Sequence, residues 1–283
     1  MQKLKLIECP RDAMQGLHDF IPTEVKIDYI NNVLDCGFDT VDFGSFVSPK
    51  AIPQMKDTAK VLEGLNTSPS KLLAIIANER GANEAVQFER IDYLGYPFSI
   101  SEEFQKRNTN ATIEESFTRV EAIQNLAIKN NKELVLYLSM GFGNPYNEEW
   151  HPDIVTEWAD KLYTKLDIKI QALSDTIGVG NPEIVKSVFE TLIPSLPNVE
   201  FGAHLHTLPE NAQSLIESAY IAGCRRFDGA IKGFGGCPMA TDDLTGNMPT
   251  ELMKGWFDSQ AIDTGLVNDS FEKAMQKAIS VFP

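Results

Sequence analysis

The stretch VEFGAHLHTLPENAQSLIESAYIAGCRRFDGAI, residues 199–231, contains a strand–helix–strand unit that decides the fold. Residues 199–206 and 226–231 are apolar without clean alternation, which is typical of strands buried on both faces of a parallel sheet. Between them, 211–223 carries apolar residues at helical spacing and ends in glycine. The unit therefore predicts two parallel strands joined by a helix.

The same unit recurs along the whole chain. We expect eight strands, at 3–9, 40–44, 71–77, 90–96, 134–140, 168–174, 199–206 and 226–231. We expect helices at 25–37, 112–131, 182–193, 211–223, 250–261 and about 270–281. Eight alternating units favour a closed (β/α)8 TIM barrel over an open doubly wound sheet, and no GxGxxG or GxxxxGK[ST] follows the first strand. We predict one domain, residues 1–283.

Composition narrows the functional class. The net charge of −15 opposes binding to nucleic acid or an anionic membrane, and no apolar run approaches the ~20 residues that span a bilayer. The four cysteines are scattered, which is typical of free thiols in a reducing compartment. We expect a cytoplasmic protein in which Cys9, Cys36 and Cys224 belong to the core.

Polar residues gather where the predicted strands end, which is the rim where TIM barrels place their chemistry. They are Arg11, Asp12, Asp42, Ser45, Ser48, Lys50, Asp175, Thr176, His204, His206, Cys237 and Asn247. His204 and His206 are two apart on a strand, so both should face the barrel mouth. They predict either two hydrogen-bonded rim histidines or, with the Asp12 carboxylate, a mixed nitrogen and oxygen site for Mg²⁺, Mn²⁺ or Zn²⁺.

The other rim residues allow two interpretations each. Arg11 could form a surface pair or stabilise a developing oxyanion. Asp42 could cap a loop or pair with Arg11, and Asp175 could be a turn residue before Gly178. Lys50 could serve an anionic ligand. Cys237 lies in the glycine-rich GFGGCP, which indicates either an incidental cysteine in a tight turn or a thiol that reaches the substrate on a mobile loop.

Several motifs together resemble 3-hydroxy-3-methylglutaryl-CoA lyase, within the DRE-TIM metallolyase superfamily. They are PRDAMQ at 10–15, SFVSPKAIPQM at 45–55, NATIEESFTRVEAI at 110–123, SDTIGVGNPE at 174–183, HLH at 204–206 and GFGGCP followed by GN at 233–247. They run in order over residues 8 to 255. SFVSPKAIPQM and GGCP are quite specific to the lyase branch, whereas RD and HxH are shared across the superfamily.

The resemblance implies a TIM barrel, often dimeric, that holds a divalent metal, Mg²⁺ or Mn²⁺ before Zn²⁺. It implies cleavage of 3-hydroxy-3-methylglutaryl-CoA to acetyl-CoA and acetoacetate. The metal ligands would be Asp12, His204, His206 and Asn247. The catalytic residues would be Arg11, Asp42, Asp175 and Cys237, and the substrate-binding residues Gln15, Ser45 and Lys50.

This sequence departs from the family pattern around those residues. The family's HxHDTYG is HLHTLPEN here, its QNEK is QGLH, and its strand-two glutamate is Asp42. Two alternatives therefore stand beside the lyase: a related metal-dependent aldolase or condensing enzyme for another hydroxy or oxo acid, and a non-catalytic acyl-CoA-binding barrel.

Overall fold

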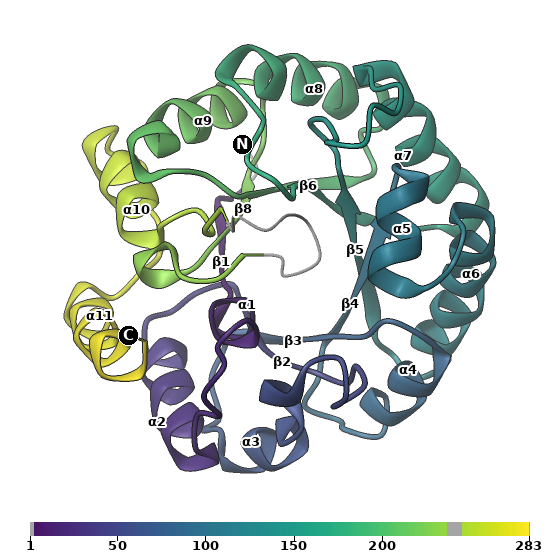
Figure 1. Ribbon diagram of the computed structural model, residues 1–283. Helices are drawn as coiled ribbons and strands as arrows, with labels where there is room; N and C mark the ends of the chain where they lie inside the picture. Colours follow the sequence, from purple (N-terminus) through teal and green to yellow (C-terminus); the bar gives the residue numbers. More distant parts are fainter. Residues whose placement is uncertain (1–2, 237–244, 283) are drawn as a thin grey trace.

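The computed structural model describes residues 3–236 and 245–282 and contains a closed barrel of eight parallel strands, in the order β1 to β8 (Figure 1). The strands are β1 (Lys5–Glu8), β2 (Thr40–Ser45), β3 (Lys71–Ile75), β4 (Tyr93–Ser99), β5 (Glu133–Ser139), β6 (Ile170–Asp175), β7 (Glu200–Leu205) and β8 (Arg226–Gly229). β1 pairs with both β2 and β8, which closes the barrel. The predicted fold class and all eight strands are confirmed, although β4 begins three residues later than expected.

Helices alternate with the strands, and most of them form a ring around the barrel (Figure 1). They are α1 (Pro10–Gln15), α2 (Thr23–Leu34), α3 (Thr58–Gly64), α4 (Glu79–Ala85), α5 (Glu102–Thr109), α6 (Ile113–Lys129), α7 (Pro152–Leu166), α8 (Pro182–Ser195), α9 (Pro209–Ile221), α10 (Thr250–Ser259) and α11 (Asn268–Val281), with 3-10 turns η1 (Pro53–Met55) and η2 (Ile231–Gly233). The capping box at Thr112 and Glu115 is confirmed. Helices α1, α3, α4, α5 and α7 were not expected; four of them have eight residues or fewer, too few for a clear helical period.

The barrel interior has an apolar side and a charged side. Alternate residues of β3 to β6 form one apolar cluster, Leu73, Ile75, Tyr93, Val135, Tyr137, Ile170 and Ala172. On the other side, the Glu200 carboxylate lies 2.6 Å from Lys5 Nζ and 3.2 Å from Arg226 Nη1, where β7, β1 and β8 begin. Charged groups continue from there into the barrel, because the buried Arg226 interacts electrostatically with Asp228 farther along β8. In the described ranges, no helix is both long and apolar enough to cross a membrane.

Glu8, at the end of β1, links β1 to the segment that follows β8, where the barrel closes. Its carboxylate accepts a hydrogen bond of 2.7 Å from the Ile231 amide and lies 2.6 Å from the Thr250 hydroxyl at the start of α10. Burial raises the pKa of Glu8 from 4.5 to about 8. The folded protein therefore keeps this proton at neutral pH, where the unfolded chain has lost it.

The Glu8→Gln variant is expected to be more stable than the parent in alkaline solution. Because the folded pKa is the higher one, the parent loses stability as the pH rises from 4.5 to about 8. Glutamine has no proton to lose and can keep both hydrogen bonds, so we expect a gain of ~1–3 kcal/mol above that window. Urea unfolding at a series of pH values measures the gain, with exposed Glu121→Gln as control. If the free energy of unfolding depended on pH in the same way in the parent and in Glu8→Gln, the raised pKa of Glu8 would be contradicted.

Candidate active site

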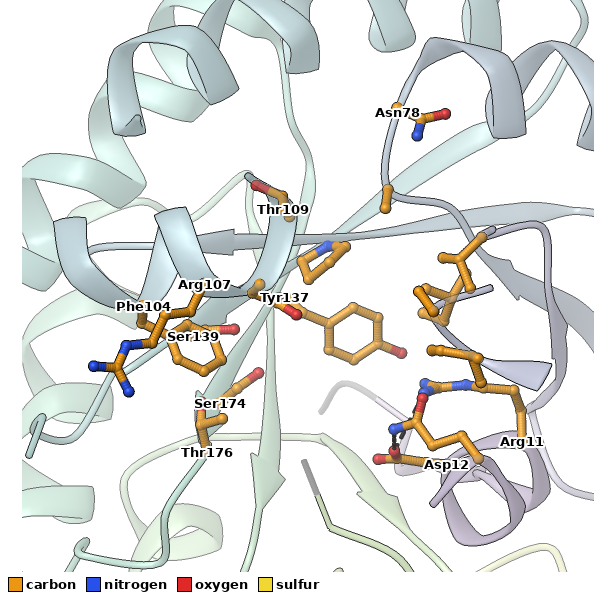
Figure 2. Close-up of a pocket in the computed structure, with 18 of the residues that line it drawn as sticks. Arg11, Asp12, Asn78, Phe104, Arg107, Thr109, Tyr137, Ser139, Ser174 and Thr176 are labelled. Atoms are coloured by element: carbon orange, nitrogen blue, oxygen red, sulfur yellow. Dashed lines mark hydrogen bonds and ion pairs between the residues drawn. The ribbon is translucent and has the colours of Figure 1, made fainter. Parts of the chain in front are cut away.

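A cavity of about 450 Å³ opens at the carboxyl ends of the strands. Its inner end is formed by Arg11, Asp12, His204 and His206. Its walls are largely apolar, formed by Val47, Ala51, Ile52, Ile75, Pro97, Phe104 and the ring of Tyr137. Figure 2 shows Tyr137 projecting across the cavity, between the α5 side and Arg11. Apolar walls with a few polar groups at one end are typical of a small-molecule site.

Three predicted metal ligands converge at the inner end. His204 Nε2 lies 3.6 Å from Asp12 Oδ2 and 3.4 Å from His206 Nε2. One ligand atom from each of the three residues lies within 4.8 Å of the others, and all three residues are buried. Two imidazole nitrogens and one carboxylate oxygen form a donor set for a divalent cation.

The charges at this end also suit a cation. Burial alone would raise the pKa of Asp12, but Arg11 and the histidines hold it well below its usual range. Burial alone would lower the pKa of His204, but Asp12 and Asp228 raise it to about 9. Burial and the neighbouring His204 lower the pKa of His206 to about 4. The site thus offers a carboxylate, a neutral imidazole and a proton on His204 that a cation would replace.

The fourth predicted ligand, Asn247, lies beside His206 through an isolated antiparallel bridge. Its Nδ2 donates to the Phe234 carbonyl at 2.9 Å, which leaves Oδ1 as the donor atom for a cation. A Cβ atom on Gly235 would lie 2.6 Å from Asn247 Nδ2 and 2.7 Å from the Asp12 carbonyl. Glycine at 235, with a φ of +100°, therefore lets this loop approach both residues.

Arg11 is buried and held by two carboxylates. Its Nε lies 3.2 and 3.0 Å from the two oxygens of Asp42, its Nη2 also bonds Asp42, and its Nη1 lies 3.2 Å from Asp12. Asp42 is fully buried and does not line the cavity. Of the two alternatives for Asp42, the structure therefore shows the pairing with Arg11. Asp42 holds Arg11 in position without facing the cavity itself.

The other predicted site residues are divided by the fold. Gln15 lines the cavity and donates to Asp12. Ser45 is buried, and its hydroxyl donates to the Ile75 carbonyl at 3.2 Å. Lys50 is exposed and does not line the cavity, although its neighbours Ser48 and Ala51 do. Cys237 lies outside the described residues.

Asp175 has the contacts of a turn residue. Burial raises its pKa to about 6, but its two oxygens accept the Val179 amide at 3.0 Å and the Gly180 amide at 2.8 Å. It does not line the cavity. These contacts favour a role for Asp175 in shaping the loop after β6. Its role as a base stays a prediction.

Two groups of residues at the site were missed from the sequence. One consists of cavity-lining residues from two helices that the sequence does not predict: Asn78, the N-cap of α4, and Arg107, Asn108, Thr109 and Asn110 at the end of α5. The other is Asp228, whose Oδ2 lies 3.1 Å from His204 Nδ1. The signal for Asp228 was a lone carboxylate in the apolar part of RFDGAI, two residues after Arg226 and so on the same face of the strand.

The Asp228→Asn variant is expected to bind Mn²⁺ about 10–100-fold more weakly, because carboxylates of this kind orient a ligating histidine and raise its basicity. Equilibrium dialysis of metal-free protein measures the affinity, with exposed Asp153→Asn as control. Equal Mn²⁺ affinity in both variants would show that His204 is positioned by packing alone.

Comparison with known proteins agrees with the motifs. The HMGL-like family model matches residues 4–277. The mitochondrial hydroxymethylglutaryl-CoA lyase of Macaca fascicularis is 34% identical over 269 residues, which cover 94% of this chain and 81% of that protein. The HMG-CoA lyase structure from Brucella melitensis has a TM-score of 0.91 at 29% identity and covers 99% of both chains. An Acinetobacter baumannii HMG-CoA lyase in complex with coenzyme A and 3-methylmalate has a TM-score of 0.90 at 29% identity, covering 99% of this chain and 91% of that one. The predicted resemblance is confirmed: this chain belongs to the HMGL-like family.

Proposed function

We propose that this protein is a divalent-metal-dependent carbon–carbon lyase that cleaves 3-hydroxy-3-methylglutaryl-CoA to acetyl-CoA and acetoacetate. The observation that carries the proposal is the inner end of the cavity, where Asp12, His204 and His206 converge beside the Arg11 guanidinium. The names of the relatives support the substrate, and the Acinetobacter baumannii complex with coenzyme A supports an acyl-CoA ligand.

The residues present fit a cation, because ligand atoms of Asp12, His204 and His206 lie within 4.8 Å of one another. Asn247 lies next to His206, and its Oδ1 is not used by the hydrogen bond to Phe234. Asp12, His204, His206 and Asn247 would hold Mg²⁺ or Mn²⁺, since oxygen and imidazole donors without a thiolate do not demand zinc. When bound there, such an ion would supply a Lewis acid that lowers the pKa of the substrate's tertiary hydroxyl.

Arg11 acts on the charge that develops during cleavage. The tertiary hydroxyl gives its proton to a base, for which Asp175 or one of the ligand histidines is the candidate. As the carbon–carbon bond breaks, the bonding electrons pass to the thioester half as an enolate. Asp42 and Asp12 raise the pKa of Arg11, which keeps it cationic, and their hydrogen bonds fix its direction. A fixed cation beside the cavity stabilises the enolate oxygen without reorganisation.

The cavity walls bind and shelter the substrate. The apolar faces of Ile52, Pro97 and Phe104 accommodate its methyl and methylene groups and exclude water. Ser139, Ser174 and Thr176 lie together on one side of the cavity and supply hydroxyl groups for its carboxylate (Figure 2). Lys50 is exposed and stands between Ser48 and Ala51, which line the cavity, so it is a candidate to bind the phosphates of coenzyme A.

Cys237 is proposed to protonate the enolate, which yields acetyl-CoA. The Cys237→Ala variant is expected to lose nearly all cleavage while it keeps its bound metal, because the thiol is absent from the ligand set. Turnover and metal content measured on one preparation test this, with Cys36→Ala as the matched thiol control. Full activity in Cys237→Ala would remove this cysteine from the reaction.

The first test of the function is an assay of purified protein with 3-hydroxy-3-methylglutaryl-CoA, with Mg²⁺ or Mn²⁺ and then with chelator. We expect acetoacetate to be released only with metal. If protein that holds one metal ion per chain gives no product, the substrate is another hydroxy or oxo acid.

We also propose that the protein is cytoplasmic and homodimeric. The buried free thiols of Cys9, Cys36 and Cys224 support a reducing compartment. Light scattering of the purified protein tests the dimer, and a monomeric mass would contradict it.

A further inference from the structure

His204 presents one ring nitrogen to each of two clusters of ligand atoms. Nε2 faces Asp12 and His206, as described above, while Nδ1 lies 3.1 Å from Asp228 Oδ2. The second cluster consists of Cys9, His204 and Asp228, called here the inner cluster. One ligand atom from each of its residues lies within 4.8 Å of the others, and all three are buried.

Neighbouring strands fix the inner cluster. Cys9 follows β1, and its amide donates to the Gly229 carbonyl of β8 at 2.9 Å. Asp228 of β8 is in register with Ile7 of β1 and with His204 of β7. The backbone therefore brings the three side chains together whether or not an ion is bound, which is the preorganisation that a metal site requires.

Two of the ligand atoms make no hydrogen bond among the described residues. Asp228 Oδ1 is buried without a hydrogen bond. The Cys9 thiol also makes none, whereas the buried Cys36 and Cys224 thiols donate to backbone carbonyls at 3.2 and 3.1 Å. Tyr137, whose ring lies edge-on to His204 at 5.2 Å, has an unpartnered buried hydroxyl as well. Buried polar atoms without partners are rare and indicate a missing ligand or water.

We propose that Cys9, His204 and Asp228 form a second cation site that takes a thiophilic divalent ion, for which Zn²⁺ is the physiological example. One thiolate, one imidazole and one carboxylate form a zinc donor set, and the sulfur disfavours Mg²⁺. On binding, the Cys9 thiol and the His204 Nδ1–H group each release a proton to solvent, and the freed sulfur and nitrogen lone pairs bond the ion. Water, or the Tyr137 hydroxyl that is buried without a partner, would complete the coordination.

The site formed by Asp12, His204 and His206 is called here the outer site. An ion in the inner cluster competes with an ion in the outer site, because both sites use His204. It replaces the hydrogen bond from His204 Nδ1 to Asp228 that orients His204 toward Asp12 and His206. We therefore expect a thiophilic ion to weaken Mg²⁺ or Mn²⁺ binding at the outer site. The competition is between cations, so it does not depend on which substrate the cavity takes.

The test uses Cd²⁺ on metal-free protein, since a cadmium–thiolate bond gives an ultraviolet charge-transfer band that nitrogen and oxygen ligands do not. The Cys237→Ala variant is the parent, which removes the thiol outside the described residues. We expect a band that saturates at one Cd²⁺ per chain and is lost when Cys9→Ser is added. Adding Cys36→Ala or Cys224→Ala should leave it unchanged, and Asp228→Asn should weaken Cd²⁺ binding about 10–100-fold.

Circular dichroism confirms that each variant is folded. No charge-transfer band in the parent, or a band that persists with Cys9→Ser, overturns the proposal. Because no substrate is present, failure of the lyase assay does not affect this result.

Discussion

The His206→Ala variant is expected to lose tight binding of the divalent metal and, with it, at least about 10³-fold in kcat, since metal stabilisation of the transition state is worth several kcal/mol. His206 is the neutral imidazole of the site, because burial and the neighbouring His204 lower its pKa to about 4. Its removal leaves Asp12, His204 and Asn247 as the proposed ligands. The measurement is metal content after dialysis, together with turnover of 3-hydroxy-3-methylglutaryl-CoA.

His151→Ala is the matched control for the loss of one histidine. His151 is exposed at the start of α7, where its Nδ1 accepts the Asp153 amide, far from the ligand set in sequence and absent from the cavity wall. We expect this variant to keep metal and activity. If His206→Ala retained one metal ion per chain at unchanged affinity, the assignment of His206 as a ligand would be wrong.

The Arg11→Gln variant is expected to lower kcat by about 10²–10³-fold or more while it keeps its metal, because removal of one preorganised oxyanion donor costs that much in other enzymes. KM should change far less, since the charge that Arg11 meets develops only in the transition state. Steady-state kinetics and metal content on the same preparation check both statements.

The fold could also suffer in Arg11→Gln, because the fully buried Asp42 would lose its partner. Breaking a buried ion pair in this way costs about 3–5 kcal/mol. The double variant Arg11→Gln with Asp42→Asn replaces the ion pair by two amides and should recover thermal stability without recovering kcat. Recovery of kcat in the double variant would show that Arg11 serves the fold and not the reaction.

The sequence could predict the barrel because its signals are local. Each strand is a short apolar run buried on both faces, and most long helices, although not α7, show a helical period, which the capping box at Thr112 reinforces in α6. Eight such strand–helix units in succession are compatible with few sheet topologies, of which the closed barrel is one. The short helices α1 and α5 were missed because six and eight residues carry little periodic information, and both line the mouth of the barrel.

The candidate ligands could also be predicted, since Asp12, His204 and His206 stand at strand ends and parallel strands of a barrel end on one rim. The role of each polar residue at this rim could not be predicted from the sequence. Asp42 and Asp175 looked equally able to act on substrate, yet one is bonded to Arg11 and the other to backbone amides. Which partner a carboxylate finds depends on side chains from other strands, which sequence spacing does not reveal.

The sequence by itself thus determined the barrel, the family and the types of residue at its rim, because periodicity and motifs are properties of neighbouring residues. Only the tertiary structure decided that Asp228 supports His204 and that Cys9 lies beside them. Cys9 and Asp228 are 219 positions apart, and they meet because closure of the sheet places β1 against β8.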